Sequence, residues 1–173
     1  MPRVIVHRAY EDSDLEDILD SSLSSLVEER ALREARRIVI KPNLCALMSP
    51  ETGATTNPRI VESLLRTLRE RSRGSTITIV ESDSVERDAE QAFDRLGYTH
   101  LSNQYDVELT NLSKDQKLLI GLPEGSFLKK LELPFTLMDC DFFISVAKLK
   151  THLFERYSGV LKNQFGCIPK RLK

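Results

Sequence analysis

Short runs of β-branched residues alternate along this chain with segments in which apolar residues recur at helical spacing. The order is a strand at 37–41, a helix at 57–71, a strand at 76–80, a helix at 86–96 and a strand at 141–146. Strands that alternate with helices form right-handed βαβ units, and such units build a parallel sheet. We therefore expect an α/β fold in three layers, with a mainly parallel sheet and helices on both faces.

Weaker segments complete the predicted fold. A first strand is expected at Arg3–His7, and a helix over 14–29 is expected to begin after Ser13, which is a good N-cap residue. The remaining expected elements are short strands at 107–109 and 117–120, an edge strand at 131–135 and a short helix at 156–164. The strand at 131–135 is placed at an edge because proline has no N–H to donate to a neighbouring strand.

The length of the chain limits it to one domain. Its 173 residues, of which 40% are hydrophobic, suffice for a single sizeable core. The chain ends on Lys-Arg-Leu-Lys directly after Pro169, with no closing helix or strand. We therefore expect residues 1–173 to form one α/β domain that is truncated at its C-terminal end.

Composition narrows the location and the partners. No apolar run approaches the roughly 18 residues that span a bilayer, and the first residues are too short in apolar character for a secretory signal. The three cysteines are distant from one another and form no C-x-x-C motif, so reduced thiols in a cytoplasmic protein are expected, without a membrane. Aromatic residues make up only 6% and tryptophan is absent, which disfavours a nucleic-acid partner despite a basic C-terminal stretch.

Polar side chains follow three of the predicted strands. Lys41 and Asn43 follow the first, Glu81 and Asp83 the second, and a Lys-x-Lys-Thr-His segment the last. Because the carboxyl ends of parallel strands share one edge of a sheet, these groups are expected to converge there. The lysines would bind an anionic group and the asparagines would orient its oxygens. Asp83 and the histidine could exchange protons or bind a metal.

The Lys-x-Lys-Thr-His segment contains the predicted catalytic residues Lys148, Lys150 and His152. On an extended chain the two lysines face the same side, and neighbouring like charges favour the neutral amine that acts as a base or Schiff-base nucleophile. Two further ligands would be needed for a metal at the histidine, so no metal site is assigned.

Each of these features also has a purely structural interpretation. A lysine at a strand end is often only extending to solvent, and the serines around Asp83 can simply cap a helix. Cys45 and Cys167 are interpreted as buried structural thiols. Glycine-rich dinucleotide and P-loop motifs are absent, as is the G-x-S-x-G motif of hydrolases, so these classes have no support.

Four blocks carry a family resemblance: Val39-Ile-Lys-Pro-Asn-Leu-Cys45, Gly53-Ala-Thr-Thr-Asn-Pro58, Val146-Ala-Lys-Leu-Lys-Thr-His152 and Gly159-Val-Leu-Lys-Asn-Gln-Phe-Gly-Cys-Ile-Pro169. Together and in this order they resemble the domain-of-unknown-function 362 family, a set of largely uncharacterised prokaryotic proteins. The motif positions of that family fall on Lys41, Asn43, Lys148, Lys150, His152, Lys162 and Asn163.

The resemblance also carries expectations about what is missing from the chain. Some family members are fused to ferredoxin-type iron–sulfur domains, which implies an iron–sulfur partner protein or domain. The ferredoxin cysteines are absent here, so no cluster is assigned. Members usually continue beyond the Lys-Asn-x-Phe-Gly block, so the chain looks like an N-terminal fragment. Its layout is also similar to the N-terminal domain of nickel-pincer lactate racemases, which place polar strand-end loops around a cofactor and a hydroxy acid.

Two functions follow as hypotheses. The first is an enzyme, or the N-terminal half of one, that binds a small anionic substrate and uses the three catalytic candidates named above. The expected substrate-binding residues are Lys41, Asn43, Asp83, Lys162 and Asn163. The second is a non-catalytic module that binds an anion or a cofactor and works with an iron–sulfur partner. The sequence identifies neither the cofactor nor the substrate.

Overall fold

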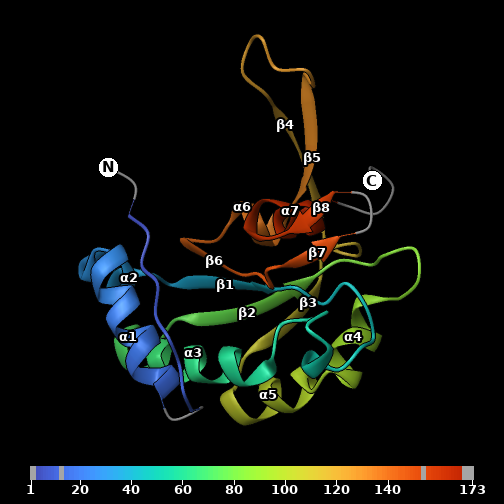
Figure 1. The fold of residues 1–173 in the computed structure, drawn as a ribbon. Coiled ribbons are helices and arrows are strands. Elements are labelled where there is room, and N and C mark those ends of the chain that lie inside the picture. Colours follow the sequence, from blue (N-terminus) through green and yellow to red (C-terminus); the bar gives the residue numbers. More distant parts are fainter. Residues whose placement is uncertain (1–2, 12–13, 153–154, 169–173) are drawn as a thin grey trace.

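A four-stranded parallel sheet forms the centre of the fold (Figure 1). The computed structural model describes residues 3–11, 14–152 and 155–168. The sheet has the order β3-β2-β1-β6, and its strands are β1 (Arg37–Pro42), β2 (Thr76–Glu81), β3 (Glu108–Asn111) and β6 (Phe142–Val146). All three pairings are parallel. The α/β class and the parallel sheet expected from the sequence are thus confirmed.

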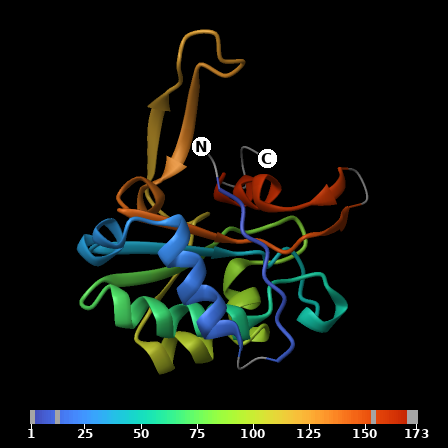
Figure 2. The same cartoon turned by 60° about the vertical axis from the view of Figure 1, so that its left-hand side comes forward.

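Helices lie on both faces of the sheet (Figures 1 and 2). One face carries the larger layer: α1 (Asp14–Leu26), α2 (Glu29–Glu34), α3 (Pro58–Arg71), α4 (Ala89–Arg95) and α5 (Tyr98–Tyr105). The other carries two short helices, α6 (Phe135–Met138) and α7 (Val160–Gln164). Single 3₁₀ turns occur at Pro50–Thr52 and Phe165–Cys167. The expected three-layer arrangement is therefore present, with unequal outer layers.

The strands alternate their side chains between two apolar clusters. Ile38 and Ile40 of β1 pack with the helices of the larger layer, together with Leu65 of α3. Val39 lies in a smaller cluster with Val80, on which Leu137 of α6 packs. This period of two follows from the pleat of a strand, and it explains why a central strand buried on both faces reads as a continuous apolar run.

Helix α3 starts and packs as its sequence predicts. The Asn57 side chain accepts a hydrogen bond from the Arg59 N–H at 3.0 Å, and Pro58 occupies the first helical position. Val61, Leu64, Leu65 and Leu68 are buried at the expected spacing. Gly97, with φ of +84°, ends α4 as expected and opens α5, a helix that the sequence did not predict.

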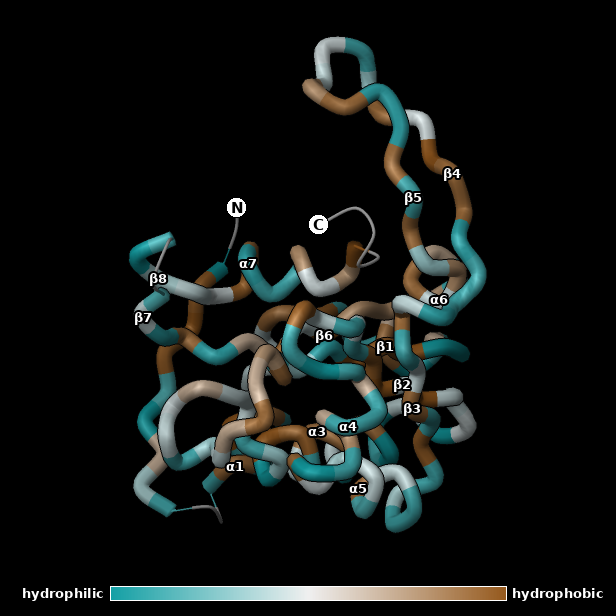
Figure 3. Tube along the Cα trace, turned by 90° about the vertical axis from the view of Figure 1, so that its right-hand side faces the viewer, coloured by the Kyte–Doolittle hydropathy of each residue, from teal (hydrophilic) through white to brown (hydrophobic). Residues whose placement is uncertain are grey.

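Two hairpins extend beyond this body. β4 (Lys117–Gly121) pairs antiparallel with β5 (Lys130–Pro134), and the pair projects away from the domain (Figures 1 and 3). β7 (Lys150–His152) pairs antiparallel with β8 (Arg156–Ser158) close to the carboxyl ends of the sheet strands. The expected strand at 131–135 therefore belongs to a separate two-stranded hairpin.

Several expected boundaries are wrong. Arg3–His7 forms no strand. Val4 and Val6 are 88% and 89% exposed, and the Arg3 side chain donates to the Ser25 carbonyl of α1. The helix expected over 14–29 ends at Leu26, and the segment expected as one helix at 156–164 begins with β8. Ser13 and Pro169 lie outside the described residues. Among the described helices, none is both long and apolar enough to cross a bilayer.

Asp141 links the beginnings of β6 and β1. The backbone N–H groups of Arg36 and Arg37 donate to its Oδ2 at 2.9 and 2.8 Å and hold the pKa of Asp141 below its ordinary value. A carboxyl with a lowered folded-state pKa stabilises the fold above its unfolded-state pKa and loses this contribution as the pH falls.

We expect Asp141→Asn to lower the free energy of unfolding at neutral pH, by an amount that shrinks toward about pH 3, below the usual carboxyl pKa of about 3.9. Urea unfolding across this pH range measures the difference from the wild type. Asp94→Asn, an exposed change on α4, serves as the control. A difference for Asp141→Asn that stays constant with pH would contradict the proposed charge effect.

Candidate functional site

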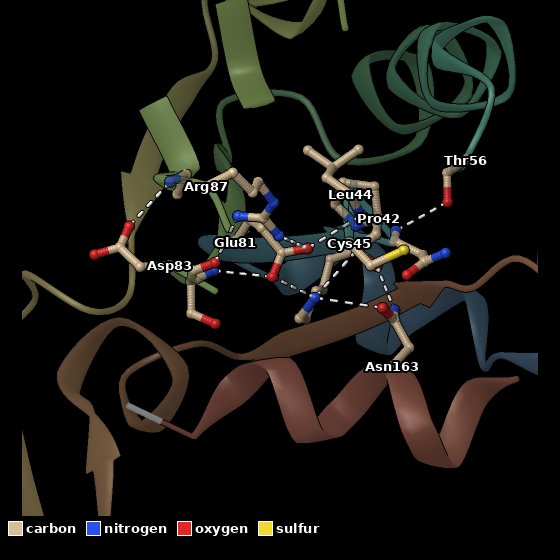
Figure 4. A network of polar contacts seen from close by, with 12 residues as sticks. Pro42, Leu44, Cys45, Thr56, Glu81, Asp83, Arg87 and Asn163 are labelled. Atoms are coloured by element: carbon tan, nitrogen blue, oxygen red, sulfur yellow. Dashed lines mark hydrogen bonds and ion pairs between the residues drawn. The ribbon is translucent and has the colours of Figure 1, made fainter. Parts of the chain in front are cut away.

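A buried ion pair joins the carboxyl ends of the two central strands. The Lys41 Nζ of β1 lies 3.0 Å from Glu81 Oε1 of β2, and the two side chains are 1% and 5% exposed. Arg87, in the connection from β2 to α4, places its Nη2 3.7 Å from the other carboxylate oxygen of Glu81. Figure 4 shows Arg87 approaching Glu81 from one side of this network and Asn163 of α7 lying on the other.

Asn163 attaches α7 to this pair. Its Oδ1 accepts from Lys41 Nζ at 3.3 Å, while its Nδ2 donates to the Lys41 carbonyl at 3.1 Å and to Ser145 Oγ at 3.0 Å. The ammonium also donates to the Pro42 carbonyl at 3.1 Å. One amide side chain thus connects α7 with both β1 and β6.

The charges in this cluster do not cancel. Glu81 accepts from the N–H groups of Ser82 and Leu44 and faces both cations, so one negative charge stands against two positive ones. The Arg87 Nη1 donates to the Ser82 carbonyl at 2.8 Å, but its buried Nε has no partner in the described part of the chain. A buried cation and an unpaired donor are both unfavourable, and an anion would satisfy both.

A cavity of about 210 Å³ opens beside this cluster. Its charged lining is mainly cationic: Lys41, Arg87, Lys150 and Lys162 stand against Glu81, its one carboxylate among the described residues, and His152 lies beside them. The rest of the wall is formed by two asparagines, three serines, one cysteine, one phenylalanine and one glycine: Asn43, Asn163, Ser82, Ser84, Ser158, Cys45, Phe165 and Gly166. The cavity lies at the carboxyl ends of β1 and β2, which is the usual ligand position in parallel sheets.

Six of the eight residues expected at the site line this cavity: Lys41, Asn43, Lys150, His152, Lys162 and Asn163. Lys148 is half-buried in the connection from β6 to β7 and does not line it, because the extended strand begins only at Lys150. The carboxylate of Asp83 also lies apart. It accepts from the Ala89 N–H at 2.9 Å and from Asn111 Nδ2 at 2.8 Å, toward α4 and β3 (Figure 4).

The long connection after β1 folds back over the strand end. Thr56 Oγ1 accepts from the Asn43 N–H at 2.9 Å and donates to the Val146 carbonyl of β6 at 2.7 Å. The Asn43 side chain donates to the Ala54 carbonyl at 3.1 Å. Thr56 therefore ties this connection to both strands and holds Asn43, which lines the cavity.

Tyr98 supports this wall from the core. Burial raises the pKa of the Tyr98 phenol, and the negative charge of Glu81 raises it further, so the side chain stays neutral. Its hydroxyl donates to the Thr56 carbonyl at 3.3 Å. A neutral donor at this position adds no charge to the cluster.

Sequence reasoning missed several residues of the cavity wall, Arg87 and Cys45 among them. Arg87 follows the polar end of β2 in a stretch of ordinary charged composition, and no spacing distinguishes it from neighbouring arginines. Cys45 was expected to be a buried thiol, and this is wrong, since it is exposed and its sulfur accepts from Lys150 Nζ at 2.9 Å. Its position directly after the Lys41-Pro-Asn segment is the signal that could have placed it at the site.

His152 ends β7 at the rim, where its Nδ1 accepts from the Glu155 N–H at 3.2 Å. Lys162 of α7 holds its ammonium 5.9 Å from the centre of the Phe165 ring. Across residues 3–11, 14–152 and 155–168, no three or more His, Cys, Asp or Glu side chains are grouped so that they could hold a metal ion.

Residues 38–173 match the family described as "Domain of unknown function (DUF362)". This chain belongs to that family. The DUF362 match includes every motif residue discussed above, so the resemblance seen in the sequence is confirmed.

Two known proteins are similar to this DUF362 chain. A thylakoid-associated protein from Synechocystis sp. is 26% identical over 137 residues, which cover 79% of this chain and 40% of that protein. The lactate racemase apoprotein from Thermoanaerobacterium thermosaccharolyticum has a similar structure, with a TM-score of 0.64 and 17% identity over 90% of this chain and 37% of the other. The second match shows a shared fold. The chain spans about two-fifths of the length of each protein.

Gly166 gives a direct test of the packing around the ion pair. A Cβ at this position would lie 2.6 Å from Lys41 Cε and 2.7 Å from its Nζ, so the ammonium would have to move. Because Lys41 is buried and held by three acceptors, we expect Gly166→Ala to lower the free energy of unfolding by about 1–3 kcal/mol. Chemical denaturation measures this loss.

Gly121→Ala is the matched control, because nothing lies within 4 Å of a Cβ built there and its φ is not in the left-handed region. Equal effects of the two substitutions would contradict the close packing of Gly166 on Lys41.

Proposed function

We propose that this cavity binds a small anionic substrate, and that the chain is an enzyme or part of one. The buried Lys41–Glu81–Arg87 cluster carries the proposal, because it has an excess of one positive charge and an Arg87 Nε without a partner. A carboxylate or phosphate oxygen accepts hydrogen bonds well from a guanidinium. Such an anion would neutralise the excess charge and satisfy the free donor.

The size of the cavity supports a small ligand. Its volume of about 210 Å³ lies below the roughly 300–1,000 Å³ typical of sites for drug-sized molecules. Lys150 and Lys162 add positive charge at its wall, which would attract anions and strengthen their binding. A metabolite with one or two anionic groups fits both the size and the charge.

Residues of the rim could supply the chemistry. His152 lines the cavity, and an imidazole is the side chain that most often serves as a general acid or base. Lys150 and Lys162 could hold the substrate while the proton moves. In this proposal Lys41, Arg87 and Asn163 form the rigid floor that orients the anion.

Binding of the anion can be tested by thermal unfolding. We expect sodium acetate, sodium lactate and sodium phosphate to raise Tm above the value in sodium chloride at equal ionic strength. A ligand at 100 times its Kd adds about 2.7 kcal/mol, which corresponds to roughly 5–10 °C for a domain of this size. Arg87→Met should abolish the increase, since it removes the unpaired donor and the excess charge together.

Arg95→Met is the control, because Arg95 is an exposed arginine at the end of α4, away from the cavity lining. If none of the three anions stabilises the wild type beyond sodium chloride, or if both variants respond as the wild type does, the proposed site is wrong.

Catalysis can be separated from simple binding through His152. We expect the wild type to exchange deuterium from solvent into a small carboxylate such as lactate, malate or pyruvate, as followed by NMR. His152→Ala should lose at least the roughly 100-fold that a general acid–base residue contributes, while its stabilisation by acetate stays near that of the wild type. Stabilisation by acetate without exchange into any of these acids would favour the non-catalytic binding module.

A further inference from the structure

We propose that Cys45 is a nucleophile of this cavity, acting on small carboxylates whose electrophilic carbon is bonded directly to the carboxylate group. This inference rests on the proposed function, because the anion must first be held by the cationic floor. It extends that function by naming the atom that attacks and the class of substrate.

The contacts of Cys45 favour a reactive thiol. Its sulfur accepts a hydrogen bond from Lys150 Nζ at 2.9 Å, and Lys150 also donates to the Ala54 carbonyl. The Cys45 thiol donates to the same carbonyl at 3.5 Å, so sulfur and ammonium share one backbone oxygen. An ammonium donor beside a sulfur stabilises negative charge on it, and the thiolate is the nucleophilic form.

The cavity supplies the second requirement, a place for the substrate. Cys45 lines the same cavity as Arg87. Arg87 is only 6% exposed, and its buried Nε has no partner in the described part of the chain. An anion on Arg87 therefore lies in the cavity that the exposed sulfur borders. Lys150 lines that cavity as well, so one cation can contact both the sulfur and the carboxylate.

The reaction balances without an added oxidant or reductant. With a 2-oxo acid, the sulfur attacks the carbonyl carbon, an S–C bond forms, and the π-electron pair moves to the carbonyl oxygen. The proton of the thiol ends on that oxygen, which gives a thiohemiketal. With iodoacetate, an S–C bond forms, the C–I bond breaks, and iodide leaves with the electron pair while the proton passes to solvent.

The chain carries two internal controls. Cys140 is half-buried, donates to the Leu137 carbonyl at 3.2 Å, and has a pKa raised mainly by burial, so it should react slowly. Cys167 is half-buried beside an apolar groove that Leu133 and Phe143 also line. Neither of them lines the cationic cavity.

The test compares an anionic with a neutral alkylating reagent on the intact protein. Rates of alkylation by iodoacetate and by iodoacetamide are measured for each cysteine by peptide mass spectrometry, with N-acetylcysteine as the reference thiol. At Cys45 we expect the ratio of the iodoacetate rate to the iodoacetamide rate to be about tenfold higher than the same ratio for N-acetylcysteine. A tenfold change corresponds to one added interaction of about 1.4 kcal/mol with the carboxylate of the reagent. Acetate and pyruvate should lower the iodoacetate rate, and Lys150→Met should return the ratio to the reference value.

The outcomes separate this inference from the proposed function. If acetate stabilises the wild type through Arg87 but Cys45 shows the reference ratio, Cys45 is not the nucleophile and the anion site stands. If acetate has no effect on Tm and Cys45 also shows the reference ratio, both proposals fail. A raised ratio that appears equally at Cys140 and Cys167 would also overturn the role of Cys45.

Discussion

The buried ion pair between Lys41 and Glu81 is the interaction on which the rest of the site depends. It joins β1 to β2, and Asn163 and Arg87 are positioned by contacts with its two members. A buried ion pair adds little net stability, because desolvation offsets its attraction, yet removal of one partner costs about 3–5 kcal/mol. Such a pair is therefore better explained by the site that it organises than by the stability that it adds.

The cavity combines a rigid floor with a less restrained rim. The floor residues Lys41, Arg87 and Asn163 are almost fully buried, whereas Lys150 and Lys162 at the rim are only partly buried. Three hydrogen bonds hold the Lys41 ammonium, and Arg87 is held by burial, by one hydrogen bond to Ser82 and by its ion pair with Glu81. The rim, with fewer such restraints, is the part that can adjust to the remainder of a ligand.

The central sheet was predictable because its strands are apolar runs bounded by polar residues and alternate with periodic helices. Lys41 and His152 were expected to meet at the shared edge of the parallel strands, and both line one cavity with Asn163 of α7. Arg87 was not predictable, since its importance comes from burial and from contact with Glu81, and both depend on tertiary packing. Lys148 was assigned to the site because residues two apart in a strand face the same side. That rule does not apply here, since β7 begins only at Lys150.

Asn163 has a consequence for the order in which the site assembles. Lys41 and Glu81 are 40 residues apart in the chain, whereas Lys41 and Asn163 are 122 apart. During synthesis the two charged strand ends therefore leave the ribosome well before the helix that covers them, and closing so long a loop is slow. Asn163 cannot contact the Lys41 ammonium before α7 has been synthesised, so the wall of the cavity is completed late.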